Sequence, residues 1–246
     1  MSNTRTFVVT YPTEARTTTK TKAMTSSTFI KHNMLVDPSI QEEIIRRAID
    51  GKFGDDPSQA VHSLGSVKLP DGREVPVYLR HAADAVVLDD FGHVVLITRK
   101  HNPGAGLKAL PGGFMDPVRG IDGATVGEKA ATAALREATE ETGISKRLLE
   151  GAQIIPLGRR SYDRPFDIRV AWGDMPGTDI KKGDLFAVST QGFSVKTTQD
   201  LSQVSLKAGD DAKHVLVATT STLTPDEFGI ADHLAMIRAA KAVAHV

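Results

Sequence analysis

Residues 128–144 constrain the fold more than any other part of this 246-residue chain. The segment predicts a short helix, and Glu137, Glu140 and Glu141 stand at i, i+3 and i+4, where they are neighbours on one face and repel each other. Gly143 follows as a suitable C′ residue, so the carboxylates occupy the last turn, where the helix dipole disfavours anions. The pattern therefore predicts a compensating cation.

A divalent cation fits this helix because Mg²⁺ prefers oxygen ligands and is usually held by one or two carboxylates together with substrate phosphates. The opposite stripe is small and mostly apolar, which suits packing on a sheet and turns the acids toward a cleft; it comprises Ala131, Leu135, Ala138 and Thr142. Upstream, residues 125–128 are typical of a capping box that starts the helix. Glu128 also lies two turns before Arg136, on a nearby face of the helix. Its two expected roles, in the capping box and beside Arg136, are both structural.

The segment resembles the Nudix box, Gly-x5-Glu-x7-Arg-Glu-U-x-Glu-Glu-x-Gly-U, in which U is a bulky aliphatic residue. The second part matches at the family's spacing through Glu128, Arg136, Glu137, Glu140, Glu141, Gly143 and Ile144. The first part departs, since Gly113 stands fifteen residues before Glu128 where the family has six, which implies nine additional residues. We expect residues 116–124 to form an exposed loop at the mouth of the active site. Ala138 is also smaller than the usual U residue.

The order of predicted elements gives a mixed α and β class. The Nudix resemblance implies an α/β/α sandwich with a mixed sheet, and it covers residues 67–246. Residues 1–60 are expected to form an N-terminal extension, partly loose, with one helix at 38–50 that Asp37 caps. Residues 55–66 are typical of a linker.

The strand pattern supports this class. An Asp71-Gly72 turn separates two short extended segments within 67–77. Further strands are predicted at 6–10, 84–88, 93–97, around 154, and at 168–171, 185–188, 193–195 and 214–218. A last helix is predicted from Thr224 to about Val243, with a capping box at its start.

Several further segments resemble the Nudix domain of bifunctional nicotinamide-mononucleotide adenylyltransferase/ADP-ribose pyrophosphatases and related ADP-ribose-recognising proteins. They occur along the chain in the same order as in that group, at 84–87, 103–114, 162–165, 209–213 and 228–233, with Lys108 where Trp is usual. This resemblance implies a Nudix pyrophosphohydrolase, a hydrolase acting on phosphoric anhydrides, that converts ADP-ribose to AMP and ribose 5-phosphate.

The resemblance also implies which residues act. Glu137, Glu140 and Glu141 would hold Mg²⁺ or Mn²⁺, and the loop around Gly113 would supply a carbonyl ligand. The metal would spread the charge of the diphosphate and acidify a bound water. Arg136 belongs to the same motif. The proton acceptor is left open among Glu140, Asp210 and Asp211, because Nudix enzymes place it either in the box or on a distant loop.

Substrate contacts have weaker signals. Arg164 could donate to a phosphate in a bidentate manner, or remain solvated. Tyr162, Phe114 and Trp172 could stack on adenine, and each also suits simple packing. His233 follows Asp232, but adjacent residues on a helix do not face each other, so a packing or capping role is expected for it.

Composition limits the partners. Lys and Arg together number 30, as do Asp and Glu, so net charge gives no general case for nucleic acid or an anionic membrane. Cysteine is absent, and no apolar run reaches the length of a membrane span. We therefore expect a cytoplasmic protein with a small-molecule nucleotide substrate, and the resemblance allows a homodimer.

Two alternatives remain open. One is a Nudix hydrolase of another substrate, such as a dinucleotide, a nucleotide sugar or a nucleoside triphosphate. The other is an ADP-ribose-sensing transcription regulator, because some relatives carry a winged helix after the Nudix domain. The residues after 218 suffice for one helix and not for a winged module, and the intact acidic triad favours catalysis.

Overall fold

The fold comes from a computed structural model of the chain. The structure describes residues 37–51, 59–101, 104–119, 125–159, 167–209, 211–230 and 232–246. The strand predicted at 6–10 lies outside these residues.

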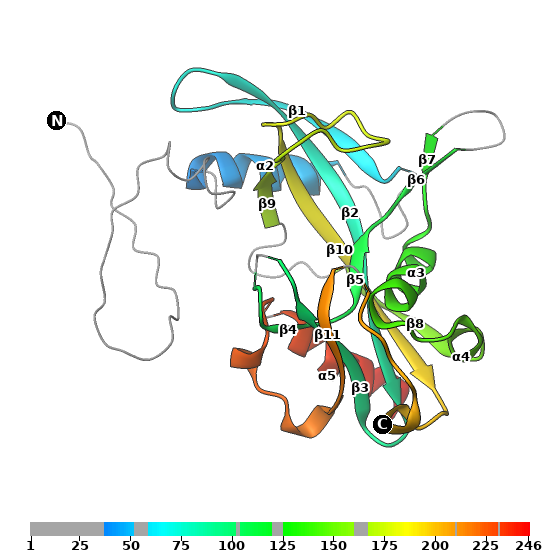
Figure 1. The fold of residues 1–246 in the computed structure, drawn as a ribbon. Coiled ribbons are helices and arrows are strands. Elements are labelled where there is room, and N and C mark those ends of the chain that lie inside the picture. The colour runs from blue at the N-terminus through cyan, green and yellow to red at the C-terminus, as the bar shows by residue number, and fades with distance from the viewer. Residues whose placement is uncertain are drawn as a thin grey trace, which may run out of the picture.

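Two long strands, β2 (Glu74–Asp89) and β10 (Leu185–Thr197), run parallel through the middle of the sheet (Figure 1). Within the described residues the sheet has nine strands, and its main path is β11-β3-β2-β10-β8. All pairings other than β2 with β10 are antiparallel, so the sheet is mixed. The remaining strands are β1 (Val61–Lys68), β3 (His93–Arg99), β4 (Lys108–Ala109), β5 (Gly112–Phe114), β8 (Gln153–Arg159), β9 (Asp167–Val170) and β11 (Ala212–Thr219).

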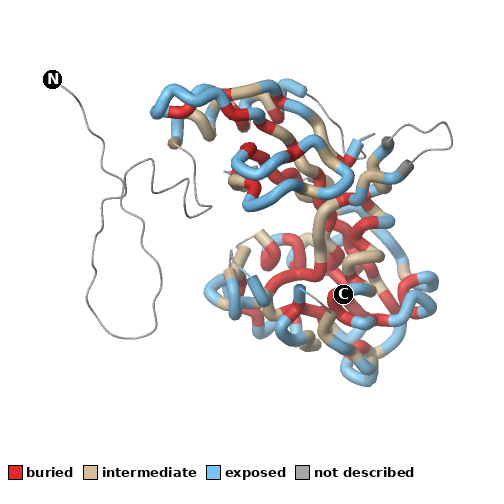
Figure 2. Tube along the Cα trace, turned by 45° about the horizontal axis from the view of Figure 1, so that its top comes forward, coloured by how far each residue is buried: buried red, intermediate tan, exposed pale blue. Residues whose placement is uncertain are grey.

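The helices lie on both faces of this sheet. They are α2 (Pro38–Asp50), α3 (Ala130–Thr142), α4 (Lys146–Glu150) and α5 (Asp232–Ala244). Ala85 and Val87 of β2 share one core with α3, whereas Val86 and Leu88 share another core with α5. Since successive strand residues point to opposite faces, α3 and α5 must cover opposite faces. The α/β/α fold class predicted from the sequence is therefore confirmed, and in Figure 2 the buried segments lie mostly in the interior and the exposed ones mostly on the outside.

Helix α2 forms as its end signals predict. The side chain of Asp37 accepts a hydrogen bond from the backbone N–H of Ser39 at 2.9 Å, Pro38 occupies the first turn, and the helix ends at Gly51. Its buried residues Ile44 and Ala48 pack in one cluster with residues of β1, β2 and β10. The boundary near residue 60 stays a prediction.

The linker prediction for 55–66 is wrong from Val61 onward, because β1 begins there and pairs with β2. The Asp71-Gly72 turn between β1 and β2 is confirmed. The two strands predicted at 185–188 and 193–195 are one continuous strand, β10. Its polar middle residues keep the strand conformation because each pairs with β2 in an unbroken parallel register.

The expected start of the metal-binding helix is also corrected. Residues Thr125–Gly127 form a strand, β7, and α3 begins at Ala130 after Lys129, which makes no side-chain cap hydrogen bond. Glu128 does not cap the helix because its carboxylate is bound to Arg136. At the other end, Gly143 takes a left-handed conformation with φ 65°, as predicted for C′.

The last helix is shorter than predicted. Thr224 and Glu227 form the expected capping box, but it opens only a single 3-10 turn, η3 (Pro225–Glu227). Gly229 then donates its N–H to the carbonyl of Lys108 at 3.0 Å, and its backbone lies against Gly104. This contact with the β4 segment interrupts the helical path, and α5 begins at Asp232.

Within residues 116–124, which were expected to form a loop, Pro117–Arg119 are a strand that forms one arm of a β-hairpin, and 120–124 lie outside the described residues. Strand β6 (Pro117–Arg119) pairs with β7 in a separate two-stranded sheet that projects from the molecule in Figure 1. Val118 and Val126 are 45% and 40% exposed, so the hairpin lies outside the core as predicted. Its base is closed by a hydrogen bond of 2.8 Å from the N–H of Glu128 to the carbonyl of Asp116.

Deleting Val118 to Val126 should leave the fold intact. The deletion joins Pro117 to Gly127 between Asp116 and Glu128, whose backbones already bond, and Pro-Gly suits the two central positions of a type II turn. We expect the free energy of unfolding to change by less than about 1 kcal/mol, because Val118 and Val126, at the two ends of the deletion, are exposed. Chemical denaturation would test this, and loss of folding would show that the hairpin supports the core.

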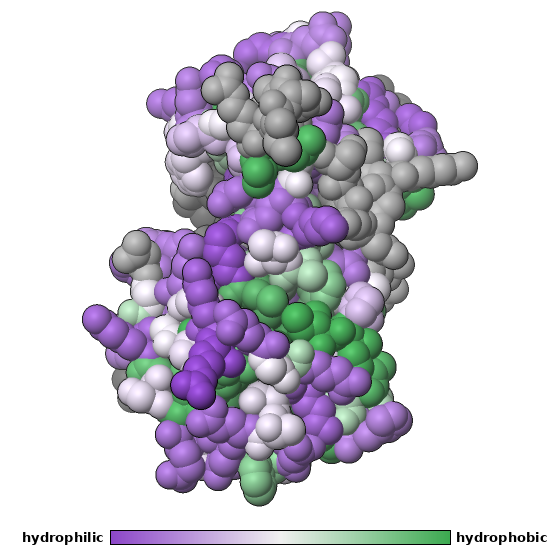
Figure 3. Space-filling model, turned by 90° about the vertical axis from the view of Figure 1, so that its right-hand side faces the viewer, coloured by the Kyte–Doolittle hydropathy of each residue, from purple (hydrophilic) through white to green (hydrophobic). Residues whose placement is uncertain are grey.

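Among the described helices, none combines the length and apolar character needed to cross a membrane. Hydrophilic side chains cover most of the face shown in Figure 3, and the largest group of hydrophobic ones lies near its middle.

Candidate functional site

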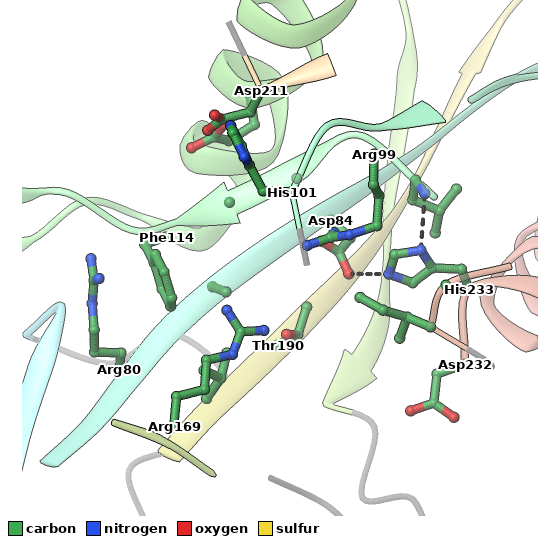
Figure 4. A pocket seen from close by; sticks show the side chains of 18 of the residues that line it. Arg80, Asp84, Arg99, His101, Phe114, Arg169, Thr190, Asp211, Asp232 and His233 are labelled. Atoms are coloured by element: carbon green, nitrogen blue, oxygen red, sulfur yellow. Dashed lines mark hydrogen bonds and ion pairs between the residues drawn. The ribbon is translucent and has the colours of Figure 1, made fainter. Parts of the chain in front are cut away.

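A cavity of about 970 Å³ opens on the sheet beside β5, α3 and the start of α5 (Figure 4). Its lining combines acidic, basic and apolar side chains from segments far apart in the sequence. The acidic members include Asp84, Asp116, Glu137, Glu141, Asp211 and Asp232, and the basic ones include Arg80, Arg99, Lys100, His101, Arg169 and His233. The sheet has thus brought the glycine loop, α3 and the 211–233 region around one space.

Glu141 is the most buried of the predicted metal ligands, at 7% exposed. Its Oε2 accepts a hydrogen bond from the N–H of Gly112 at 2.9 Å. Burial raises the pKa of Glu141 to about 8; that hydrogen bond opposes the rise, and the negative charges of Glu137, Asp84 and Asp211 add to it. A cation placed beside this carboxylate would therefore remove an electrostatic cost.

Glu137 lies in the same lining, with its side chain 16% exposed. Burial raises its pKa as well, against the lowering effect of Arg136. A Cβ at Gly113 would approach Glu137 Oε2 to 2.8 Å, and a Cβ at Gly112 would approach the carbonyl of Ala83 to 2.7 Å. Glycine at both positions lets the loop lie directly against the carboxylates.

Glu140 faces another direction. Its side chain is 58% exposed, it is ion-paired to Arg136 at 3.0 Å, and it does not line the cavity. Arg136 also binds Glu137 at 2.8 Å and Glu128 at 3.0 Å, and it donates to the carbonyl of Phe114 at 3.0 Å. Burial lowers the pKa of Arg136, but Glu128 and Glu137 outweigh this effect and raise it. Arg136 thus fixes the acidic face of α3 to β5.

The remaining predicted residues separate into three groups. Gly113, Phe114 and Asp211 line the cavity with Glu137 and Glu141. Trp172 is 67% exposed and is not part of the lining. Tyr162, Arg164 and Asp210 lie outside the described residues.

His233 connects α5 to the glycine loop. It is 3% exposed, and its Nδ1 accepts a hydrogen bond from the N–H of Leu110 at 3.0 Å (Figure 4). Since Nδ1 accepts, the proton of the neutral ring is on Nε2, which lies 3.4 Å from Asp84 Oδ2. The packing role expected for His233 therefore includes holding Leu110, two residues before Gly112.

Two substitutions separate the two sides of the His233 ring. His233→Asn keeps an oxygen near the position of Nδ1, whereas His233→Gln places its amide near Nε2 and leaves the N–H of Leu110 without an acceptor. A buried unpaired donor costs about 1–3 kcal/mol. We expect the Gln variant to be less stable than the Asn variant by at least about 1 kcal/mol in urea denaturation. Equal stability would mean that the hydrogen bond to Leu110 contributes little.

A second acidic group lies away from the cavity. Ligand atoms of Asp89, His93 and Asp200 lie within 4.8 Å of one another. The fully buried Asp89 already accepts backbone N–H bonds from Phe91, His93 and Leu201. These bonds, together with contact to the His93 ring at 2.9 Å, lower the pKa of Asp89 against the raising effect of burial, so its role is to join two turns.

Among the lining residues that the sequence did not predict as site members are Arg80, Asp84 and Arg169. The alternation along β2 could have indicated two of them, because Arg80 and Asp84 share a face with Ala82 while Leu79, His81 and Ala83 point the other way. For Arg169 the strand pattern alone carries no comparable signal, since β9 has only four residues.

Residues 78–174 match the family model of the NUDIX domain. The chain contains a NUDIX domain. The match includes the Gly112-Gly113 loop, the hairpin insertion and all of α3. The chain is also 38% identical over 85 residues to an ADP-ribose pyrophosphatase of Methanocaldococcus jannaschii. That similarity covers 34% of this chain and 44% of the relative, less than half of its length.

Two solved structures resemble this one at low identity. The NUDIX domain of Shewanella oneidensis NrtR complexed with ADP ribose is 19% identical, with a TM-score of 0.44, covering 67% of this chain and 87% of that one. A bifunctional NMN adenylyltransferase/ADP ribose pyrophosphatase from Francisella tularensis is 25% identical, with a TM-score of 0.42, covering 66% and 40% of the two chains.

Proposed function

We propose that this NUDIX domain is a divalent-metal-dependent pyrophosphohydrolase that cleaves a nucleoside diphosphate linked to another group, with ADP-ribose as the first candidate. The observation that carries the proposal is the pair of the partly buried Glu137 and the buried Glu141, which lie beside Gly112 and Gly113 in a large cavity. The similarity to an ADP-ribose pyrophosphatase of Methanocaldococcus jannaschii supports ADP-ribose as the substrate. Hydrolysis of its phosphoric anhydride would give AMP and ribose 5-phosphate.

The donor set fits a hard divalent cation. Two adjacent carboxylates, both with raised pKa values, face the cavity, and carboxylate oxygen is the ligand that Mg²⁺ and Mn²⁺ prefer. Glu137 and Glu141 would hold the ion, while Glu140 could join them only by leaving Arg136. When bound, the ion would polarise the diphosphate and lower the pKa of a coordinated water.

The protein's own residues would position the metal ligands and accept the proton. Arg136 holds Glu137 in place, and the N–H of Gly112 orients Glu141. We propose Asp211 ahead of Glu140 as the proton acceptor, because Asp211 lines the cavity and its charge acts on Glu141. The phosphate contact of Arg164, adenine stacking by Tyr162 or Phe114, a homodimer and a cytoplasmic location stay predictions.

A substrate panel tests the proposal. With Mg²⁺ present, ADP-ribose should give the highest kcat/KM among ADP-ribose, NADH, diadenosine polyphosphates, nucleotide sugars and nucleoside triphosphates. A preference of tenfold or more for a triphosphate, about 1.4 kcal/mol of transition-state binding, would reject ADP-ribose and retain the hydrolase. Binding of ADP-ribose without turnover of any substrate would instead favour a ligand-sensing role.

A further inference from the structure

Arg80 lies in the cavity without a strong partner. It precedes Asp84 by four residues on β2, a separation of about 13 Å along an extended strand. Its guanidinium carbon is 3.5 Å from the centroid of the Phe114 ring, and its Nη1 lies 3.2 Å from the sulfur of Met175. Within the described residues, its Nε is buried and has no hydrogen-bond partner. Figure 4 shows Arg80 beside Phe114, with Arg169 nearby.

Two other partly buried arginines, Arg47 and Arg136, are well compensated. Arg47 binds Glu43 at 2.8 Å and two backbone carbonyls, and Arg136 binds three glutamates. No ion pair within the described ranges involves Arg80. A ring face and a thioether are weak partners for a guanidinium, so Arg80 retains unused donors.

The surroundings of Arg80 favour an anionic ligand. Burial lowers its pKa to about 10; the charge of Asp116 opposes this effect and the positive charge of Arg169 adds to it. Asp116 forms no ion pair with Arg80, and its side chain is 63% exposed. An anion between the two guanidinium groups would offset both the burial of Arg80 and its repulsion from Arg169.

Geometry narrows the class of anion. Arg169 lines the same cavity from β9, and β10 lies between the two arginines, with Val188 beside Arg80 and Phe186 beside Arg169 in the strand register. Planar guanidinium forks match phosphate oxygens in a bidentate manner. The same cavity contains Glu137 and Glu141, which would repel a phosphate in the absence of a metal ion.

We propose that Arg80 and Arg169 form an anion subsite that binds a phosphoryl group of the ligand, on the Phe114 side of the cavity. The claim that this subsite binds the substrate rests on the proposed function. The claim that it binds a phosphate does not. The phosphoryl group could belong to either half of a nucleoside diphosphate derivative. AMP carries the phosphate of the nucleotide half, and ribose 5-phosphate carries that of the other half. Binding of one or the other therefore identifies the half that supplies the phosphoryl group.

Calorimetric titration of AMP and of ribose 5-phosphate, with EDTA to exclude divalent ions, tests the subsite. We expect at least one of them to bind the wild-type protein, and Arg80→Met to weaken that binding at least tenfold. Arg80→Lys should be intermediate, because lysine keeps the charge and lacks the fork. Arg73→Met is the matched control, since Arg73 is 62% exposed, pairs with Asp71 and does not line the cavity.

Two readouts separate binding from folding and from catalysis. Without ligand, Arg80→Met should melt at the same temperature as the wild type or higher, because it removes a buried charge that lacks a carboxylate partner. Glu141→Gln should bind the monophosphate at least as well as the wild type in EDTA. Absence of hydrolysis by the wild type would reject the proposed enzyme and leave these binding results unaffected.

Three outcomes would overturn the subsite. The first is that the wild type binds neither monophosphate at about 20 mM. The second is that Arg80→Met binds the monophosphates with affinities within twofold of the wild type. The third is that Arg80→Met weakens the binding of neutral adenosine or ribose as much as it weakens the binding of the monophosphates. The last result would assign Arg80 to packing instead of phosphate recognition.

Discussion

Glu141→Gln should lower kcat by at least about a hundredfold, equivalent to roughly 2.7 kcal/mol of activation free energy. The carboxylate is buried in the cavity lining beside Glu137 and accepts the N–H of Gly112. An amide of the same size still accepts that hydrogen bond but lacks the charge that would hold a divalent cation. Steady-state kinetics with ADP-ribose over a Mg²⁺ titration would measure the effect.

Glu150→Gln is the matched control, because Glu150 is exposed at the end of α4 and does not line the cavity. It should keep the activity of the wild type. A Glu141→Gln variant that is fully active at every Mg²⁺ concentration would remove Glu141 from the metal site.

The effect of Glu141→Gln on the stability of the metal-free protein should depend on pH. Because the pKa of Glu141 is raised from 4.5 to about 8 in the fold, the unfolded chain releases this proton first, and the metal-free protein loses stability as pH rises from about 5 to 8. Glu141→Gln lacks this loss, so its melting temperature should exceed that of the wild type by more at pH 8 than at pH 5. A constant difference across this range would contradict the buried, uncompensated carboxylate.

Arg136→Met should cost about 3 kcal/mol of unfolding free energy, at the lower end for breaking a buried ion pair. The side chain of Arg136 is 24% exposed, and its partners Glu128 and Glu137 are 10% and 16% exposed. Removing the guanidinium leaves both carboxylates near each other without a cation and frees the carbonyl of Phe114. Urea denaturation in EDTA would measure the loss of unfolding free energy. In thermal unfolding the same loss should lower Tm by about 6–12 °C.

Arg46→Met controls for the loss of an arginine that bridges two acids on a helix. Arg46 is 61% exposed and pairs with Glu43 and Asp50, themselves 43% and 64% exposed, so its removal should cost less than about 1 kcal/mol. If Arg136→Met were as mild as Arg46→Met, the acidic face of α3 would not depend on Arg136.

Local signals in the sequence predicted much of the fold. Asp37-Pro38, Gly51 and Gly143 act at helix ends through backbone hydrogen bonds that involve few residues, and all three are confirmed. The capping box at Thr125 failed because pairing of β7 with β6 and the ion pair of Glu128 with Arg136 outweighed a local cap. The last helix was broken by a contact between Gly229 and Gly104, which are far apart in the sequence.

In the candidate site, too, local signals predicted some features, and contacts between distant segments determined the others. Spacing within one helix was enough to single out Glu137 and Glu141, which lie together in the cavity lining. It did not indicate that Arg136 would draw Glu140 toward solvent, because that depends on where Glu128 and β5 lie. Arg80 and Arg169 belong to strands on opposite sides of β10, and only the sheet order brings them to one cavity.

Hydrolysis of ADP-ribose in ¹⁸O-labelled water, with products identified by mass spectrometry, tests the central claim most directly. With Mg²⁺ or Mn²⁺ we expect AMP and ribose 5-phosphate, with one ¹⁸O atom in one of the two phosphate groups, and no reaction in EDTA. Cleavage that is independent of metal, or products of ADP and ribose that indicate attack at carbon, would contradict a phosphoric anhydride hydrolase built around Glu137 and Glu141.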